Sequence, residues 1–233
     1  MERMLSYLKI KVNESLYLKD PESSEVGKRI LQQSIRMIDE MGLEAFTFKK
    51  LADKANTTES TVYRYFENKH KLLLYLSNWY WAWLDYRMVF ALNNIQDPNE
   101  KLSKAVEILT SNAALDHLIE HMDLVTLGHL IHSESSKIFR IKDVDKENEE
   151  GYYHGYKLLC MRLQEVILQI APGFPHANSL ASTILEGIHK QYFFAEHLPK
   201  LTDIRNPAQD LPHFFLEITT SVLDRFKSEQ NGQ

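Results

Sequence analysis

Hydrophobic residues recur every three or four positions along most of the chain, which is the period of an amphipathic α-helix. The first helix is expected to start at Asp20-Pro21, with Asp as N-cap and Pro in the first turn, and to stop at Gly42. A very aromatic helix is predicted from Lys69 to about Asn94. The pattern therefore predicts an all-α fold.

Further helices follow the same period. They are expected at about 97–114, 115–133, 152–171, 178–198 and 210–227. The stretch 133–151 is polar and charged, so it is interpreted as a loop or a mobile helix end.

Residues 46–69 are predicted to form two short helices with a tight corner between them. Thr47 is a good N-cap for the first helix. Asn56 sits at the corner, where a left-handed backbone is needed and Asn tolerates it better than most residues. Thr57 or Thr58 can then cap the second helix.

The second short helix has an inward and an outward side. Val62 and Phe66 are four residues apart and should point inward. The opposite side carries Glu59, Ser60, Tyr63 and Arg64. These groups can hydrogen-bond to base edges or phosphates, and Arg suits guanine in the major groove. The arrangement is that of a helix-turn-helix; the alternative is an ordinary helical hairpin, which is common in all-α domains.

Specific residues add a resemblance to this pattern. Leu51-Ala52, the run Thr-Val-Tyr-Arg-Tyr-Phe at 61–66, and Asn68-Lys69 before a leucine-rich helix resemble the DNA-binding domain of the tetracycline-repressor (TetR/AcrR) family. The resemblance covers residues 24 to 73. It implies that Thr47 and Lys69 contact phosphates and that the outer positions of the second helix read bases. The expected DNA-binding residues are Thr47, Thr58, Glu59, Ser60, Thr61, Tyr63, Arg64 and Lys69.

Two positions depart from the family pattern. The family usually has Gly at the corner and an apolar residue after it, whereas this chain has Asn56 and Thr57. Glu59 places an acid opposite a polyanion, which should lower affinity unless it accepts a hydrogen bond from a cytosine amino group.

Composition narrows the class of protein. The chain has 233 residues, of which 44% are hydrophobic and 25% charged, as in globular proteins. Cys160 is the only cysteine, which excludes an internal disulfide and fits a reducing cytoplasm. With no apolar run long enough to cross a bilayer, a cytoplasmic protein that does not contact membranes is expected. No Gly-rich phosphate loop or nucleophile elbow appears, so neither an enzyme nor a cofactor is predicted.

Charge is unevenly distributed. The net charge is −5, but residues 24–72 carry nine Lys and Arg against seven Asp and Glu, or +2. Residues 1–23 balance at four against four, and the remainder carries fourteen against twenty-one, or −7. A mildly basic head on an acidic body would orient the protein on DNA.

Three parts are therefore predicted. Residues 1–19 form an extension, residues 20–72 the helix-turn-helix domain, and residues 73–233 an effector-binding and dimerisation domain. The extension is interpreted as a loosely docked terminus; the alternative is an arm that crosses DNA or packs on a partner subunit.

The third part, residues 73–233, contains candidate ligand-binding residues. Its aromatic stripe and its histidines could line a pocket, and plain core packing is the alternative for each ring. The candidates are Trp83, Tyr86, Phe90, His117, His121, His129 and Tyr156. His117 with His121, or His129 with His132, has a spacing that could hold a metal. Polar or pocket-lining roles are preferred for them, so no metal is predicted.

The resemblance also implies how the protein assembles. In the family the last two helices pair with their copies in a second subunit; the alternative is an internal hairpin. The expected dimerisation residues are Ile184, Ile188, Tyr192, Phe215, Ile218 and Val222. The predicted protein is a homodimeric repressor that binds a palindromic operator and releases it on binding an apolar or aromatic effector. The alternatives are a helical ligand-binding or protein-interaction module that does not read DNA, and a metal-dependent enzyme using His117 to His132.

Overall fold

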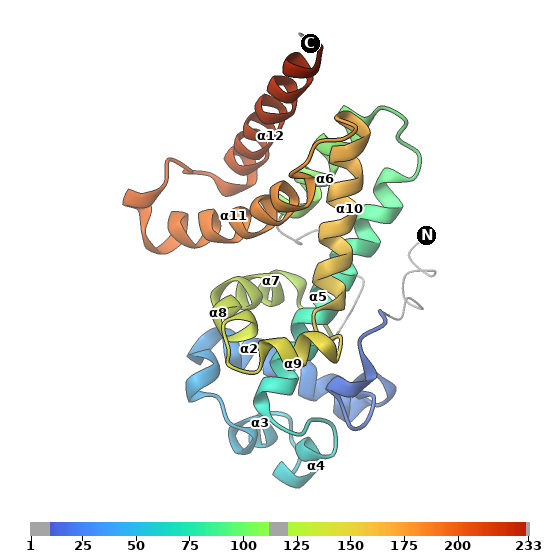
Figure 1. The fold of residues 1–233 in the computed structure, drawn as a ribbon. Coiled ribbons are helices and arrows are strands. Elements are labelled where there is room, and N and C mark those ends of the chain that lie inside the picture. Colours follow the sequence, from blue (N-terminus) through green and yellow to red (C-terminus); the bar gives the residue numbers. More distant parts are fainter. Residues whose placement is uncertain (1–9, 112–120, 232–233) are drawn as a thin grey trace. The chain divides into compact units, whose positions relative to one another are not determined.

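The computed structural model describes residues 10–111 and 121–231, and throughout these ranges every regular element is a helix (Figure 1). This confirms the all-α prediction. Contacts divide the chain into two compact units. The first unit holds Met1–Ala82 and Asn112–Gly155, and the second holds Trp83–Ser111 and Tyr156–Gln233. The division of roles among residues 1–19, 20–72 and 73–233 stays a prediction.

The first unit contains the predicted DNA-binding head and a second group of short helices. Its elements are the 3-10 turns η1 (Glu14–Leu16) and η2 (Pro21–Ser23), then α2 (Glu25–Ala45), α3 (Phe48–Lys54), α4 (Glu59–Tyr63), the first part of α5 (Lys69–Leu92), α7 (Leu124–Ser133), α8 (Ser135–Phe139), α9 (Val144–Glu149) and the start of α10 (His154–Ile170).

The start and end of α2 differ from the prediction. Asp20 does cap a helical turn, but that turn is η2, and α2 begins only after Ser24, whose hydroxyl accepts from the Gly27 N–H. At the other end Gly42 breaks the helical geometry with a φ of 73°, as its position predicted. One more turn follows it as far as Ala45.

The head follows the sequence closely. Thr47 caps α3 by accepting from the Lys50 N–H, and Thr58 caps α4 by accepting from the Thr61 N–H. Asn56 has a φ of 49°, which makes it the one non-glycine residue with positive φ among the residues that can be described. The tight corner is therefore built as predicted.

The long helix α5 is apolar on most of its sides in the first unit. Its residues from Leu72 to Leu76 are buried, as are the indoles of Trp79 and Trp81. The helix continues into the second unit and ends at Leu92, where the prediction had about Asn94. Phe90, the last ring of the predicted stripe, is 65% exposed.

The prediction for residues 133–151 is wrong. This stretch forms α8 and α9, and it packs Ile138 and two carboxylates into the first unit. Glu134 accepts a hydrogen bond from the backbone N–H of Leu43 at 3.0 Å. The carboxylate thus satisfies an N–H group next to Gly42, where the helical geometry is broken. The predicted helix 115–133 lies partly outside the described residues, and α7 starts at Leu124 after the Asp123 cap.

The second unit contains the last two long helices. Its elements are the end of α5, α6 (Pro98–Thr110), the rest of α10, α11 (Ala177–His197), the 3-10 turn η3 (Pro199–Leu201) and α12 (Pro207–Asn231). The helices α11 and α12 contact each other, and both contact α6. Ile184, Ile188 and Phe215 are buried in this packing, so within one chain they belong to an internal hairpin. Among the described helices, none has the length and hydropathy to cross a membrane.

Candidate nucleic-acid interface

The outer side of α4 presents a polar surface. Glu59, Ser60 and Arg64 are exposed, and Thr61 is half-buried. Tyr63 is 49% exposed, and its ring lies edge-on to Phe48 of α3 with centroids 5.0 Å apart. That contact limits where the phenol can point.

The inner side of α4 is closed. Val62 and Phe66 are fully buried and Tyr65 is 3% exposed, so the turn of chain after α4 is also fixed to the core. The helix α3 packs against α4, and both are drawn in Figure 1. Because one side of α4 is buried, its polar side must face outward, as the sequence predicted.

Hydroxyl groups cluster where α4 begins. The Thr58 hydroxyl lies 3.0 Å from the Ser60 hydroxyl and 2.8 Å from that of Thr61, in addition to capping the helix. The Thr58 hydroxyl therefore stabilises the start of α4. Thr47 does the same for α3, since its Oγ1 accepts from the Lys50 N–H while the residue itself is exposed.

Lys69 is predicted to bind a phosphate, but its ammonium is engaged by backbone carbonyls of the same unit. Its ammonium donates to the carbonyls of Leu43 at 2.9 Å, Glu44 at 3.2 Å and Phe46 at 3.4 Å. These carbonyls lie at the end of α2, where the helix leaves acceptors unsatisfied. Phosphate binding by Lys69 stays a prediction, and the geometry gives the residue a capping role.

Two more helix ends receive distant donors. The Arg29 guanidinium donates through Nε to the Ala55 carbonyl at 3.3 Å, just after α3. The backbone N–H of Leu18 donates to the Tyr65 carbonyl at 2.8 Å, just after α4. The carboxyl ends of α2, α3 and α4 are thus each held by a donor that is distant in sequence. The smallest of these separations is twenty-three residues, between Lys69 and Phe46. Helical periodicity carries no signal for such contacts.

Among the other basic side chains of the head, some are engaged by neighbouring groups and some are exposed. Lys28 pairs with Glu25 at 2.9 Å, and Lys71 contacts the Ser15 carbonyl and the Tyr152 hydroxyl. Lys49, Lys54 and Arg64 are exposed, and within the described part of the chain no hydrogen bond or ion pair engages their charges. They are the cations best placed to meet phosphates.

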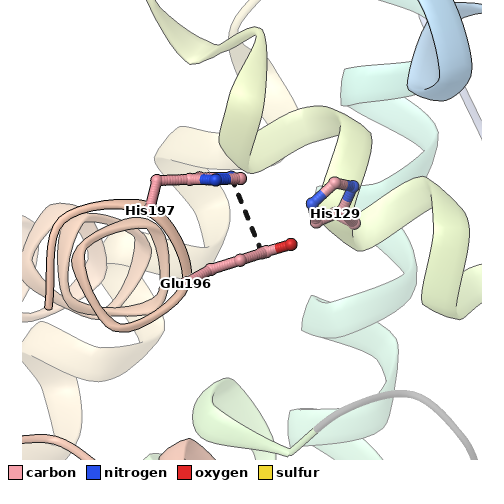
Figure 2. A group of neighbouring side chains, drawn as sticks. All are labelled: His129, Glu196 and His197. Atoms are coloured by element: carbon pink, nitrogen blue, oxygen red, sulfur yellow. Dashed lines mark ion pairs between the residues drawn. The ribbon is translucent and has the colours of Figure 1, made fainter.

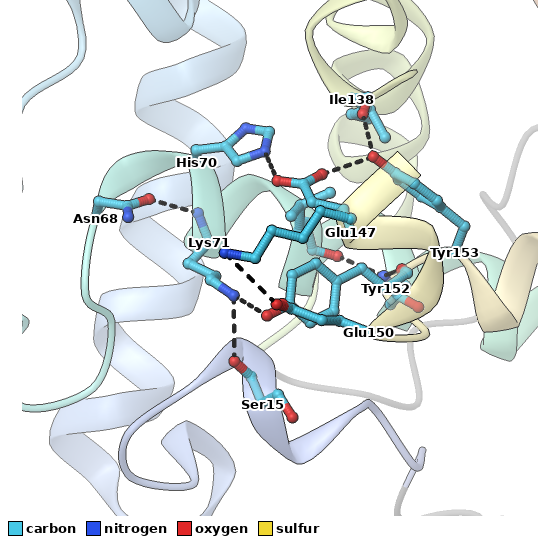
Figure 3. A network of polar contacts seen from close by, with 12 residues as sticks. Ser15, Asn68, His70, Lys71, Ile138, Glu147, Glu150, Tyr152 and Tyr153 are labelled. Carbon is cyan, nitrogen blue, oxygen red and sulfur yellow. Dashed lines mark hydrogen bonds and ion pairs between the residues drawn. The ribbon is translucent and has the colours of Figure 1, made fainter. Parts of the chain in front are cut away.

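A polar network joins the start of α5 to α9 (Figure 3). His70 lies 2.8 Å from the Glu147 carboxylate, which also accepts a 2.6 Å hydrogen bond from the Tyr153 hydroxyl. Lys71 lies over the Tyr152 ring at 3.8 Å. Burial raises the pKa of Tyr153 above its ordinary value, and Glu147 adds to the effect. These contacts fix residues 144–153 to the head.

Two of the histidines that the sequence singled out pair with carboxylates of the head. His121 lies 2.8 Å from Glu22, and His129 Nδ1 contacts the Asp39 carboxylate. Burial lowers the pKa of His132 to about 3, so this imidazole is neutral near pH 7. His117 lies outside the described residues. In the first unit these side chains therefore do structural work.

In the second unit the end of α11 carries an adjacent acid and imidazole. Figure 2 shows Glu196 and His197, which form an ion pair with 3.8 Å between Oε2 and Nε2. Both side chains are exposed. His129, also drawn there, belongs to the first unit.

The remaining predicted effector residues lie in the second unit. Trp83 is buried with the Arg87 guanidinium 4.9 Å from its ring, and Tyr86 is half-buried. The Tyr156 hydroxyl donates to Glu186 at 2.7 Å. His121 and His129 belong to the first unit, so the two units share the predicted effector set between them.

Comparison with known proteins agrees with this geometry. Residues 30–76, which hold most of α2, all of α3 and α4, and the start of α5, match the model for bacterial regulatory proteins of the tetR family. This stretch of the chain therefore matches the DNA-binding domain of the TetR family. This confirms the resemblance, and regulators of this family are not enzymes, as the sequence predicted for this chain.

Individual relatives extend the comparison. The chain is 41% identical over 47 residues to the uncharacterized HTH-type transcriptional regulator YvkB of Bacillus subtilis, a match that spans 20% of this chain and 25% of that protein. The fatty acid degradation regulator FadR from Bacillus halodurans is similar in structure, with a TM-score of 0.60 at 18% identity over 82% of this chain and 96% of that one. AibR in complex with isovaleryl coenzyme A and operator DNA has a TM-score of 0.56 at 16% identity over 81% of this chain and 95% of that one. At these identities the structural matches establish the fold.

Proposed function

We propose that this chain is a TetR-family regulator, a ligand-responsive transcriptional repressor that binds a palindromic operator as a homodimer. The observation that carries the proposal is the outer side of α4. Glu59, Ser60, Tyr63 and Arg64 are exposed there, while the inner side is buried against α3 and the core. A short helix held in this way can enter the major groove, where Arg64 would contact guanine and Ser60 or Tyr63 would contact neighbouring groups.

Dimerisation is required by the size of the reading surface. One five-residue helix contacts too few bases for specificity, whereas two copies about 34 Å apart would read both half-sites of a palindrome. Exposed apolar residues on α12 support a partner contact. Phe214 is 39% exposed and Val222 is 42% exposed, and Ile218 lies between them at helical spacing. Of the dimerisation residues predicted from sequence, Ile218 and Val222 remain the best candidates.

Effector control follows from the continuity of two helices. Both α5 and α10 begin in the first unit and end in the second, so a ligand bound by the second unit can act on the head through them. The ligand must bind more tightly to the conformation that does not fit DNA, since only a difference in affinity shifts the equilibrium. Trp83 and Tyr86 favour an apolar or aromatic effector.

Selection of bound fragments from genomic DNA with the purified full-length chain tests the proposal. The selected duplexes should share a palindrome, and Tyr63→Ala should lower affinity for that duplex by a factor of roughly ten. Arg205→Ala is the matched control, because Arg205 is exposed in the second unit and far in sequence from α4. Recovery of no preferred duplex would overturn DNA reading and favour a helical ligand-binding or protein-interaction module.

A further inference from the structure

The N-terminal segment, defined as residues 10–19, is fixed to the first unit. Leu16 is 1% exposed and Ile10 is 6% exposed. Asn13 donates through Nδ2 to the Glu150 carbonyl at 2.8 Å, and the Lys71 ammonium lies 3.5 Å from the Ser15 carbonyl (Figure 3). The interpretation of the extension as loosely docked is therefore wrong for residues 10–19.

The segment reaches the chain immediately after the recognition helix α4. The N–H of Leu18 donates to the Tyr65 carbonyl at 2.8 Å, and the Lys19 ammonium lies over the Tyr65 ring at 5.3 Å. The Tyr65 hydroxyl is 2.8 Å from the hydroxyl of Ser24, the N-cap of α2. The backbone, ring and hydroxyl of one residue are thus all held by residues 18–24.

The position of Tyr65 explains why this matters for α4. The helix has five residues, too few to be stable without tertiary contacts. Its amino end is held by the Thr58 cap, and its carboxyl end leaves carbonyls without intrahelical donors. Tyr65 lies two residues beyond Tyr63 and one beyond Arg64, so a shift at Tyr65 moves the two largest side chains of the reading surface.

We propose that Leu18 and Lys19 are positioning residues for DNA recognition, which hold the carboxyl end of α4 through Tyr65 without contacting the DNA themselves. The inference rests on the proposed DNA-binding function. Holding α4 in place changes affinity for the preferred duplex, which needs exact placement of Tyr63 and Arg64. It changes affinity for unrelated duplexes much less, because those contacts are mainly electrostatic.

Leu18→Pro compared with Leu18→Ala isolates one hydrogen bond. Both variants lose a side chain that is 67% exposed, but only the proline also removes the N–H. Tyr17 before it has φ −140° and ψ 154°, a conformation that a residue preceding proline adopts readily. The measurement is the ratio of affinities for the selected palindrome and an unrelated duplex of equal length, together with the melting temperature.

Leu18→Pro is expected to lower this ratio by a factor of roughly five to ten relative to Leu18→Ala, the size of one lost hydrogen bond. Equal ratios in the two variants, with a parent that does select a palindrome, would overturn the inference. A parent that selects no duplex would instead overturn the proposed function. The two failures are therefore distinguishable.

Two further variants decide the case if Leu18→Pro does not fold. Tyr65→Phe removes only the hydroxyl that meets Ser24, and Lys19→Met keeps the side-chain stem but removes the charge over the ring. Each should lower the ratio by roughly twofold to fivefold. If Lys19→Met weakens both duplexes equally and reduces the salt dependence, Lys19 is a phosphate contact and its positioning role is wrong. If Tyr65→Phe leaves the ratio unchanged as well, the inference is overturned.

Discussion

On the outer side of α4 the Arg64 guanidinium is exposed, and no hydrogen bond engages it within the described ranges. The Arg29 guanidinium, by contrast, donates to the Ala55 carbonyl at the end of α3. Lys69 repeats the second arrangement at the end of α2 with three carbonyls. Side chains of the same charge thus serve outward recognition in one place and internal capping in the other.

The difference shows that charge alone does not identify DNA contacts. The head has nine basic residues, but several of them satisfy carbonyls or carboxylates of the same unit. Apolar residues divide in the same way in the second unit, where Ile184 is buried and Val222 is 42% exposed. In both cases the exposed side chains that are not used in packing or capping are the candidates for contacts with DNA or a second subunit.

Substitutions on the last two helices should show the largest contrast. Ile184→Ala should lower the free energy of unfolding by about 2–5 kcal/mol, because it removes buried methyl groups and leaves a cavity. Val222→Ala should change it by less than about 0.5 kcal/mol in a dilute, monomeric sample. Chemical denaturation measures both. Val222→Glu should additionally abolish the homodimer in sedimentation experiments, and a dimer that survives it would exclude this part of α12 from the contact.

Lys69→Met tests whether capping or phosphate binding dominates. Loss of the ammonium leaves three carbonyls without their donor, so the free energy of unfolding should fall by about 1–3 kcal/mol. Lys49→Met is the matched control, since Lys49 is exposed and should leave the stability unchanged while reducing the salt dependence of DNA binding by about one counterion. A stable Lys69→Met protein with reduced salt dependence would restore the phosphate role.

Arg64→Ala compared with Arg29→Met tests whether one guanidinium serves DNA recognition and the other serves helix capping. Arg64→Ala should cost about 1–3 kcal/mol of affinity for the selected duplex and relax the preference at one base pair, with an unchanged melting temperature. Arg29→Met should lower the melting temperature and should not change which base is preferred. Duplex titrations with single base-pair replacements separate the two. A change of base preference in Arg29→Met would place its guanidinium at the DNA.

The effect that is smallest near neutral pH is a dependence of stability on pH. Burial lowers the pKa of His132 to about 3 from an ordinary value of 6.5, so below about pH 6.5 the unfolded chain binds a proton that the folded chain does not. The free energy of unfolding should therefore fall as the pH decreases from about 6.5 towards 3. One bound proton limits the slope to about 1.4 kcal/mol per pH unit, and the partial exposure of the side chain narrows the pH range over which the slope applies. Acid denaturation measures this, and the free energy of unfolding of His132→Asn should fall less between about pH 6.5 and 3 than that of the parent.

Local sequence rules predicted the head because its folding signals are local. Thr47, Asn56 and Thr58 act within four residues of their own position, and Val62 and Phe66 share one side of a helix. Residues 133–151 were mispredicted because their charges looked solvated. Glu134 and Glu147 are in fact buried, and each meets a donor from α2 or α5 that lies more than seventy residues away.

The site was predictable to the same extent. Helical periodicity predicted the outward side chains of α4. It did not predict the groups that donate hydrogen bonds to the carbonyls at the ends of the head's helices. Leu18, Arg29 and Lys69 act across distances in sequence at which no pattern of polar and apolar residues carries information. The apolar residues of α11 and α12 had the right period for a helix contact, but periodicity does not distinguish a contact within one chain from a contact between two.

The shortness of α4 has a practical consequence. With five residues in a chain whose described regular elements are all helices, its loss would hardly change a circular dichroism spectrum. A preparation can therefore pass every test of helicity and thermal cooperativity while its reading surface has frayed. Only titration against cognate DNA, or an amide-exchange measurement at residues 59–66, would reveal the damage.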